Sequence, residues 1–176
     1  MSHTVIRAAL MSWIVACVLL GPEVEARTAV VAQACKPVPG KDLERFYPPM
    51  PGWTRGEPSS ETDVAEAVSR TTVDFDRKLE TISVELMDSC RNPDVLQLIR
   101  NVLKEMPPAT SGTTQRYTRV NGFPAYEEFT AMSGHGEIHV LVGDRFLIKV
   151  TAETSTLPTL QNSANLIPMQ TLADIK

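Results

Sequence analysis

The sequence lacks the short motifs that identify common enzyme classes from residues alone. It contains no G-x-x-x-x-G-K phosphate loop, no G-x-G-x-x-G fingerprint and no G-x-S-x-G elbow. It has no C-x-x-C pair, which argues against a dithiol redox role. It also has no internal repeat and no low-complexity tract. These absences favour a domain without chemistry of its own over an enzyme.

Long apolar runs are scarce, and the one near the N-terminus is short. Ala8 to Gly21 are almost all apolar, whereas a transmembrane helix needs about 20 such residues. Arg7 precedes the run, Pro22 follows it, and Val24-Glu25-Ala26 offers a small-residue cleavage pattern. This order is typical of a secretory signal peptide over residues 1–26, so we expect a periplasmic or secreted protein.

Two other interpretations of the leader place the protein at a membrane. The leader could be retained as an N-terminal anchor. Alternatively, Ile14-Val15-Ala16-Cys17 resembles a bacterial lipobox, and lipid on Cys17 would make a membrane-anchored lipoprotein. The apolar run continues after Cys17, which argues against cleavage there. Ala32-Gln33-Ala34-Cys35 is a weaker match to the lipobox pattern, because its first residue, Ala32, is smaller than the large aliphatic residue usual there.

The remaining composition predicts one ordinary domain. Removal of Arg7, Glu23 and Glu25 from the 17 Lys+Arg and 21 Asp+Glu leaves a net charge of −3. A mildly acidic chain argues against nucleic acid as a partner, since that surface is basic. We expect an N-terminal arm or linker over 27–40, rich in proline at its end, and a single domain over 41–176.

Cysteine is rare, and removal of the leader leaves Cys35 and Cys90. An even number in an exported protein predicts a disulfide, with two free or separately buried thiols as the alternative. Closing a loop of that length stabilises the fold by about 4 kcal/mol on the entropy model. The bridge would tie the arm to the folded body.

Periodicity in the first half predicts a hairpin and a helix. Alternation over Ala65–Asp76 and Leu79–Met87 predicts two strands joined by a polar turn at Asp76-Arg77-Lys78. Asn92-Pro93 is typical of a helix start. The apolar stripe of that helix consists of Val95, Leu98, Ile99, Val102 and Leu103, and Pro107-Pro108 ends it.

Two features precede the hairpin in the chain. Asp42–Phe46 could form one helical turn, and we expect the Trp53 side chain to pack at the edge of the core rather than stack on a ligand.

The second half predicts an antiparallel meander followed by a helix. The expected strands are Thr113–Val120, Phe123–Met132, Glu137–Val142 and Arg145–Thr151, joined by turns at Asn121-Gly122, Ser133–Gly136 and Gly143-Asp144. A helix is expected over Leu157–Ile167 and a last helical turn over Thr171–Ile175. The fold class is therefore α+β, an antiparallel sheet of about six strands with the two amphipathic helices covering one face.

Several phrases of the sequence resemble small bacterial exported proteins with a PsbP-like fold. They are "YPPMPGW", "NGFPAYEEFTA" and "EIHVLVGDRFLIKVTAE", in the order hairpin, helix, strands and closing helix. The group includes the DcrB-like and LpqN-like lipoproteins, and the resemblance covers roughly Leu43 to Lys176. It implies a PsbP-like α/β sandwich and an accessory or assembly role, and it implies no catalytic residues.

The residues that could carry chemistry are few, and each has a structural interpretation. His135 and His139 would lie about 13 Å apart on a strand, too far for one metal ion. Glu127 and Glu128 are adjacent, so they point to opposite faces and are expected to be solvated. Asp88 before the helix fits turn chemistry. We therefore expect no catalytic residue, no metal and no cofactor.

A candidate partner surface lies on the face opposite the strand residues that point inward. It consists of Tyr126, His139, Leu141, Leu147 and Lys149. The competing interpretation is that the terminal helix covers this face.

These observations lead to three hypotheses for function. The first is an exported, non-enzymatic accessory or binding domain that assists an envelope protein or complex. The second is a small-ligand carrier or sensor with a pocket between sheet and helix. The third is an enzyme with no recognisable motif. Membrane contact is expected only if Cys17 is lipidated or the leader is retained.

Overall fold

The computed structural model describes residues 35–90, 92–102 and 111–175. The predicted signal peptide, the lipidation candidate Cys17 and the predicted helix end at Pro107-Pro108 lie outside these residues, as does most of the predicted arm. None of the described helices is long and apolar enough to cross a membrane.

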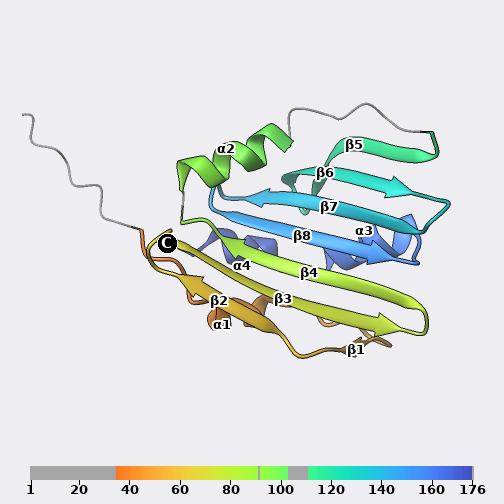
Figure 1. The fold of residues 1–176 in the computed structure, drawn as a ribbon, viewed down its shortest axis with the longest axis horizontal. Helices are drawn as coiled ribbons and strands as arrows, with labels where there is room; N and C mark the ends of the chain where they lie inside the picture. Colours follow the sequence, from red (N-terminus) through yellow and green to blue (C-terminus); the bar gives the residue numbers. More distant parts are fainter. Residues whose placement is uncertain (1–34, 91, 103–110, 176) are drawn as a thin grey trace, which may run out of the picture. The chain divides into compact units, whose positions relative to one another are not determined.

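The central element of the fold is an eight-stranded antiparallel sheet (Figure 1). The strand order is β1-β3-β4-β8-β7-β6-β5, and β2 pairs with β3 off this path. The strands are β1 (Thr54–Arg55), β2 (Ser59–Asp63), β3 (Val68–Arg77), β4 (Glu80–Asp88), β5 (Thr113–Val120), β6 (Phe123–Thr130), β7 (His135–Val142) and β8 (Phe146–Glu153). The predicted six are all present, and β1 and β2 are additional. Every residue of β1 and β2 is exposed, so neither strand has the alternation that reveals a half-buried strand.

The hairpin turns are mostly where the sequence predicts them. Asn121 and Gly122 have φ of 51° and 87°, and Gly143 and Asp144 have φ of 61° and 50°, as tight hairpin turns require. In the first hairpin, however, Arg77 pairs with Glu80. The turn therefore consists of Lys78 and Leu79 and begins two positions later than predicted, because Asp76 and Arg77 are still strand residues.

The predicted turn over 133–136 is wrong at its second half. The turn ends at Gly134, and β7 begins at His135, which pairs with Thr130. Gly136 is a buried strand residue rather than a turn residue. A Cβ at Gly136 would lie 2.5 Å from Phe129 Cδ2 and 2.7 Å from the Glu128 carbonyl oxygen. Gly136 is thus required by close packing across the sheet.

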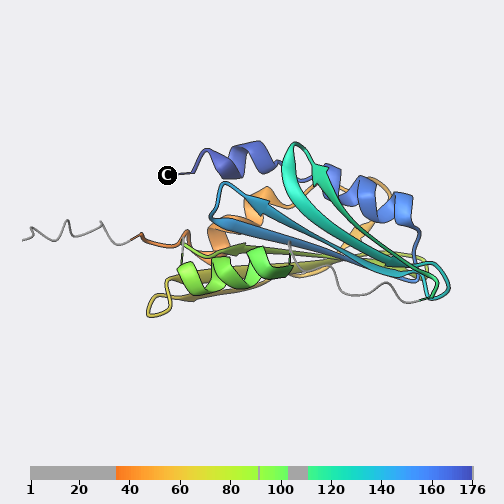
Figure 2. The same cartoon turned by 90° about the horizontal axis from the view of Figure 1, so that it is seen from above.

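The helices lie on both faces of the sheet, as Figure 2 shows. They are α1 (Gly40–Leu43), the 3-10 turn Glu44–Phe46, α2 (Pro93–Val102), α3 (Leu157–Asn165) and α4 (Met169–Ala173). The α2 start is confirmed, because Asn92 Oδ1 accepts a hydrogen bond of 3.0 Å from the Asp94 amide.

The prediction that α2 and the terminal helix cover the same face is wrong. Leu160 and Ala164 of α3 are fully buried in the main core, together with the inward residues of the sheet. Leu96 of α2 instead packs against Leu141 on the opposite face, and Leu147 packs against this small cluster. The second face of the sheet also carries apolar side chains, Leu141 and Leu147, and α2 shields them from water.

The main core lies between the sheet and the helices α1, α3 and α4. The inward strand residues predicted from alternation all belong to it: Val73, Phe75, Ile82, Val84, Leu86, Ile138, Val140, Val142, Phe146, Ile148 and Val150. Trp53 packs at the edge of this core, as predicted, with the Arg77 guanidinium 4.3 Å above its ring.

Candidate functional site

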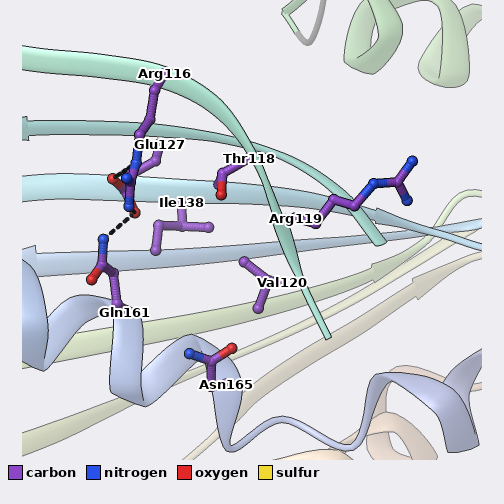
Figure 3. A pocket seen from close by; sticks show the side chains of 8 residues that line it. All are labelled: Arg116, Thr118, Arg119, Val120, Glu127, Ile138, Gln161 and Asn165. Atoms are coloured by element: carbon purple, nitrogen blue, oxygen red, sulfur yellow. Dashed lines mark hydrogen bonds and ion pairs between the residues drawn. The ribbon is translucent and has the colours of Figure 1, made fainter. Parts of the chain in front are cut away.

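A hollow of about 190 Å³ opens between the sheet and α3 (Figure 3). Strands β5, β6 and β7 form one wall, and α3 forms the other. The lining residues are Arg116, Thr118, Arg119, Val120, Glu127, Ile138, Gln161 and Asn165. The hollow therefore combines a charged pair, polar side chains and an apolar floor.

Glu127 lies at the inner end of the hollow and is only 1% exposed. Its neighbours on the same face of β6 are Ala125 and Phe129, and Ile138 is its partner on β7. A carboxylate at a position surrounded by apolar side chains is costly unless it is fully paired. The prediction that Glu127 is solvated is wrong, whereas its orientation opposite to Glu128 is confirmed.

Arg116 supplies the counter-charge from the neighbouring strand. The register places Arg116 directly opposite Glu127. Its Nε donates to Glu127 Oε1 at 2.6 Å and its Nη2 to Oε2 at 3.3 Å. Half of the Arg116 side chain remains exposed. In this ion pair the carboxylate is therefore buried, whereas the guanidinium group belongs to a half-exposed side chain.

Gln161 closes the arrangement from the helix side. Leu160 and Ala164 fix α3 on the sheet, which turns Gln161 toward β6. Gln161 Nε2 donates to Glu127 Oε2 at 2.8 Å. Both carboxylate oxygens therefore have donors, and the side chain of Glu127 is held from two elements.

The rest of the hollow offers groups that are not engaged. The side chains of Thr118 and Asn165 make no hydrogen bond within the described residues, and neither does Arg116 Nη1. Val120 and Ile138 provide the apolar floor between them. The hollow can accept hydrogen-bonding and apolar atoms of a small molecule, whereas its lining includes no His, Cys or Ser.

The partner surface predicted from the sequence divides into two parts. Tyr126, His139 and Lys149 lie in one row across β6, β7 and β8. Leu141 and Leu147 lie beside that row and are covered by α2, through Leu96 and Val95. The competing interpretation, in which the terminal helix covers this face, is wrong, since α3 packs on the other side.

Charged groups in this row form a network. The Glu137 carboxylate lies 3.0 Å from His139 Nε2 and 2.8 Å from Lys149 Nζ. The His139 contact is close but poorly aligned for a hydrogen bond. These two neighbours lower the pKa of Glu137 to about 2. Next to it, the Tyr126 hydroxyl donates to Glu128 Oε2 at 2.7 Å, and burial raises the pKa of Tyr126.

Both histidines lie on β7, and each faces a glutamate. His135 Nδ1 is paired with Glu153 at 2.9 Å, and His139 faces Glu137. Within residues 35–90, 92–102 and 111–175, no three His, Cys, Asp or Glu side chains gather as metal ligands.

Asp88 belongs to a clamp on the N-terminal segment. The predicted disulfide between Cys35 and Cys90 is present. Asp88 accepts hydrogen bonds of 2.8 Å from the Cys90 amide, as turn chemistry predicts, and from the Val38 amide. It is also fully buried against Arg145, whose Nη2 donates to it at 2.7 Å. The role of Asp88 is therefore structural.

Sequence reasoning missed Arg116 and Gln161 altogether. One signal could have led to Arg116: alternation along β6 places Glu127 between Ala125 and Phe129, and the Asn121-Gly122 turn sets Arg116 opposite it. The contribution of Gln161 has no such signal, because it depends on the position of α3 over the sheet.

Comparison of the chain with family models, with curated proteins and with solved structures found no match. The resemblance to PsbP-like proteins therefore stays a prediction from the sequence.

Proposed function

We propose that the protein is an exported binding domain without chemistry of its own, which holds a small ligand in the hollow between β5–β7 and α3. This is the carrier or sensor role that the sequence left as an alternative. The disulfide supports the export part of the proposal, because such bonds persist in oxidising compartments.

The observation that carries the proposal is the Glu127 carboxylate, which is 1% exposed on the apolar face of the sheet. An apolar side chain there would pack with Ala125 and Phe129 at no desolvation cost. A carboxylate that is instead fixed by Arg116 and Gln161, at the end of a hollow, is the kind of preorganised polar group that orients a ligand.

A fragment screen by ¹H–¹⁵N NMR tests the proposal. We expect saturable shifts of the Thr118 and Asn165 amides with at least one class of small anionic, neutral or cationic probe. Thr118→Trp would fill the hollow and abolish these shifts. Tyr117→Trp adds the same ring to the adjacent residue on the opposite face, so it is the matched control and should bind as the wild type does. Absence of saturable shifts with every probe class contradicts the proposal.

A second candidate is an accessory role through an envelope protein, as the sequence first suggested. It is favoured by Tyr117 and Lys149, which are the exposed ends of a row across four adjacent strands; Tyr126, between them, is only 3% exposed. No described helix covers Tyr117, which is 41% exposed, or Lys149. Affinity capture from envelope extracts with the mature protein and with Lys149→Glu tests this role. A partner lost in the variant would support it, and recovery of no reproducible partner would count against it.

A further inference from the structure

We infer that the hollow between β5–β7 and α3 binds a small monocarboxylate, whose carboxylate pairs with the outer edge of the Arg116 guanidinium. This inference rests on the proposed function, because it names the chemical class of the ligand at the same site. It is carried by the geometry of the guanidinium, the charge balance of the lining and the size of the hollow.

The geometry of Arg116 leaves one edge of its guanidinium available. Its Nε and Nη2 donate inward to the two oxygens of Glu127. Nη1 makes no hydrogen bond in the described part of the chain, and the side chain is 52% exposed. A guanidinium presents donors in a planar fork that matches a carboxylate. Glu127 and Gln161 therefore act as positioning residues: Gln161 fixes the carboxylate, and the carboxylate holds the Nε–Nη2 side of an arginine that lines the hollow (Figure 3).

The charge of the lining favours a single negative charge on the ligand. Arg116 and Arg119 are cationic, Glu127 is anionic, and no other lining residue is ionisable. Helix α3, with the sequence LPTLQNSAN, adds no charge. The guanidinium of Arg119 is turned away to the Gly122 carbonyl at 2.6 Å, so it contributes at the rim only. The Arg116–Glu127 pair is neutral, so the single excess positive charge lies at the rim, and this weak positive bias suits a carboxylate better than a phosphate dianion.

The size of the hollow restricts the ligand to a few carbon atoms beyond the carboxylate. A volume of about 190 Å³ corresponds to roughly six water molecules at about 30 Å³ each. Sites for drug-sized molecules are larger, at about 300 Å³ or more. Val120 and Ile138 would contact the short apolar part, and Thr118 and Asn165 lie where a second polar group of the ligand would find partners.

The test titrates the disulfide-bonded protein with butyrate, 1-butanol and n-butylammonium at constant ionic strength. These probes share a carbon chain and differ in charge. The readouts are the Arg116 Nε–Hε cross-peak and the Thr118 and Asn165 amides. We expect butyrate to shift all three saturably, with an affinity at least tenfold above that of butanol, and butylammonium to have no effect on the arginine signal.

Two variants distinguish binding of butyrate in the hollow from nonspecific attraction of anions to arginine side chains. Arg116→Met combined with Glu127→Met removes both charges while keeping side-chain volume, so the fold is expected to persist. This double variant should lose the butyrate shifts at Thr118 and Asn165. Arg119→Gln removes the rim charge alone and should weaken butyrate binding less than threefold.

The outcomes distinguish the inference from the proposed function beneath it. Butanol or butylammonium binding as tightly as butyrate overturns the inference and leaves the proposed function standing. Unchanged butyrate shifts in the double variant also overturn the inference, because the anion would then bind elsewhere. Binding of no probe at all contradicts both. A fourth titration uses N-acetylalanine, which carries its carboxylate next to a peptide group; binding tighter than that of butyrate would support the inference and point to a peptide chain end as the source of the carboxylate.

Discussion

Removal of Arg116 should destabilise the fold far more than removal of Glu127, although the two side chains form one ion pair. The asymmetry follows from their exposure, which is 52% for the Arg116 side chain and 2% for that of Glu127. Arg116→Met leaves a carboxylate buried without its counter-charge. Glu127→Met leaves an arginine that water already solvates, and it places an apolar side chain among apolar neighbours.

The magnitudes follow from the same contacts. An orphaned buried charge costs about 3–5 kcal/mol. We expect about 3 kcal/mol for Arg116→Met, at the low end, because Gln161 still donates to Glu127 at 2.8 Å. Loss of a half-exposed pair costs about 1 kcal/mol or less, so Glu127→Met should lie within that range. The double variant should also lie within about 1 kcal/mol of the wild type.

Equilibrium unfolding in urea measures these differences with little effect on ionic strength. The four proteins form a double-mutant cycle, from which the coupling between the two sites is obtained. Equal losses for the two single variants would refute the reasoning, and so would a loss below 1 kcal/mol for Arg116→Met. Either result would mean that Glu127 is not held as a buried charge.

Three further predictions concern the clamp, the sheet and the network on the second face. Replacing Cys35 and Cys90 by serine should lower the free energy of unfolding by about 4 kcal/mol, since the bridge spans a sequence separation of 55. Gly136→Ala should cost about 1–3 kcal/mol in urea unfolding, because its Cβ would lie 2.5 Å from Phe129 Cδ2. The pKa of Glu137 is lowered from 4.5 to about 2. Its stabilisation should therefore be complete above pH 4.5 and should be lost, by about 3 kcal/mol, as the pH falls from 4.5 to 2.

Each of these predictions has its own control. The serine variant should match the reduced wild type, and a change below 1 kcal/mol would contradict the clamp. Gly56→Ala, whose nearest contact is 3.3 Å, should cost less than Gly136→Ala, and the reverse order would contradict the packing argument. Glu137→Gln should flatten the acid limb of the stability curve, and an unchanged limb in urea titrations would contradict the assigned pKa.

The sequence predicts those parts of the fold whose signals are local. Asn121-Gly122 and Gly143-Asp144 mark their turns because only small or Asn/Asp residues adopt positive φ readily. Asn92-Pro93 marks the start of α2 by a side-chain oxygen that caps the helix. Strands with one buried face, such as β4, are visible as alternation. Residues up to four positions apart carry these signals.

Features that depend on distant residues were not predictable in the same way. β2 is exposed on both faces and is recognisable only by its partner β3. The burial of Asp88 depends on Arg145, which is 57 residues away in the sequence. Glu127 and Glu128 look alike in the sequence. Alternation along β6 and the Asn121-Gly122 turn indicate which of the two faces inward, whereas the contact of Glu127 with Gln161 depends on the position of α3 over the sheet.

The central claim, a ligand site at the Arg116–Glu127 pair, is tested most directly by the Arg116 Nε–Hε cross-peak during a butyrate titration of the disulfide-bonded protein. We expect a saturable shift that is absent with butylammonium, together with saturable shifts at Thr118 and Asn165 that disappear in the Arg116→Met, Glu127→Met double variant. An arginine signal that does not respond to butyrate, or pocket amides that respond equally in the double variant, would contradict it.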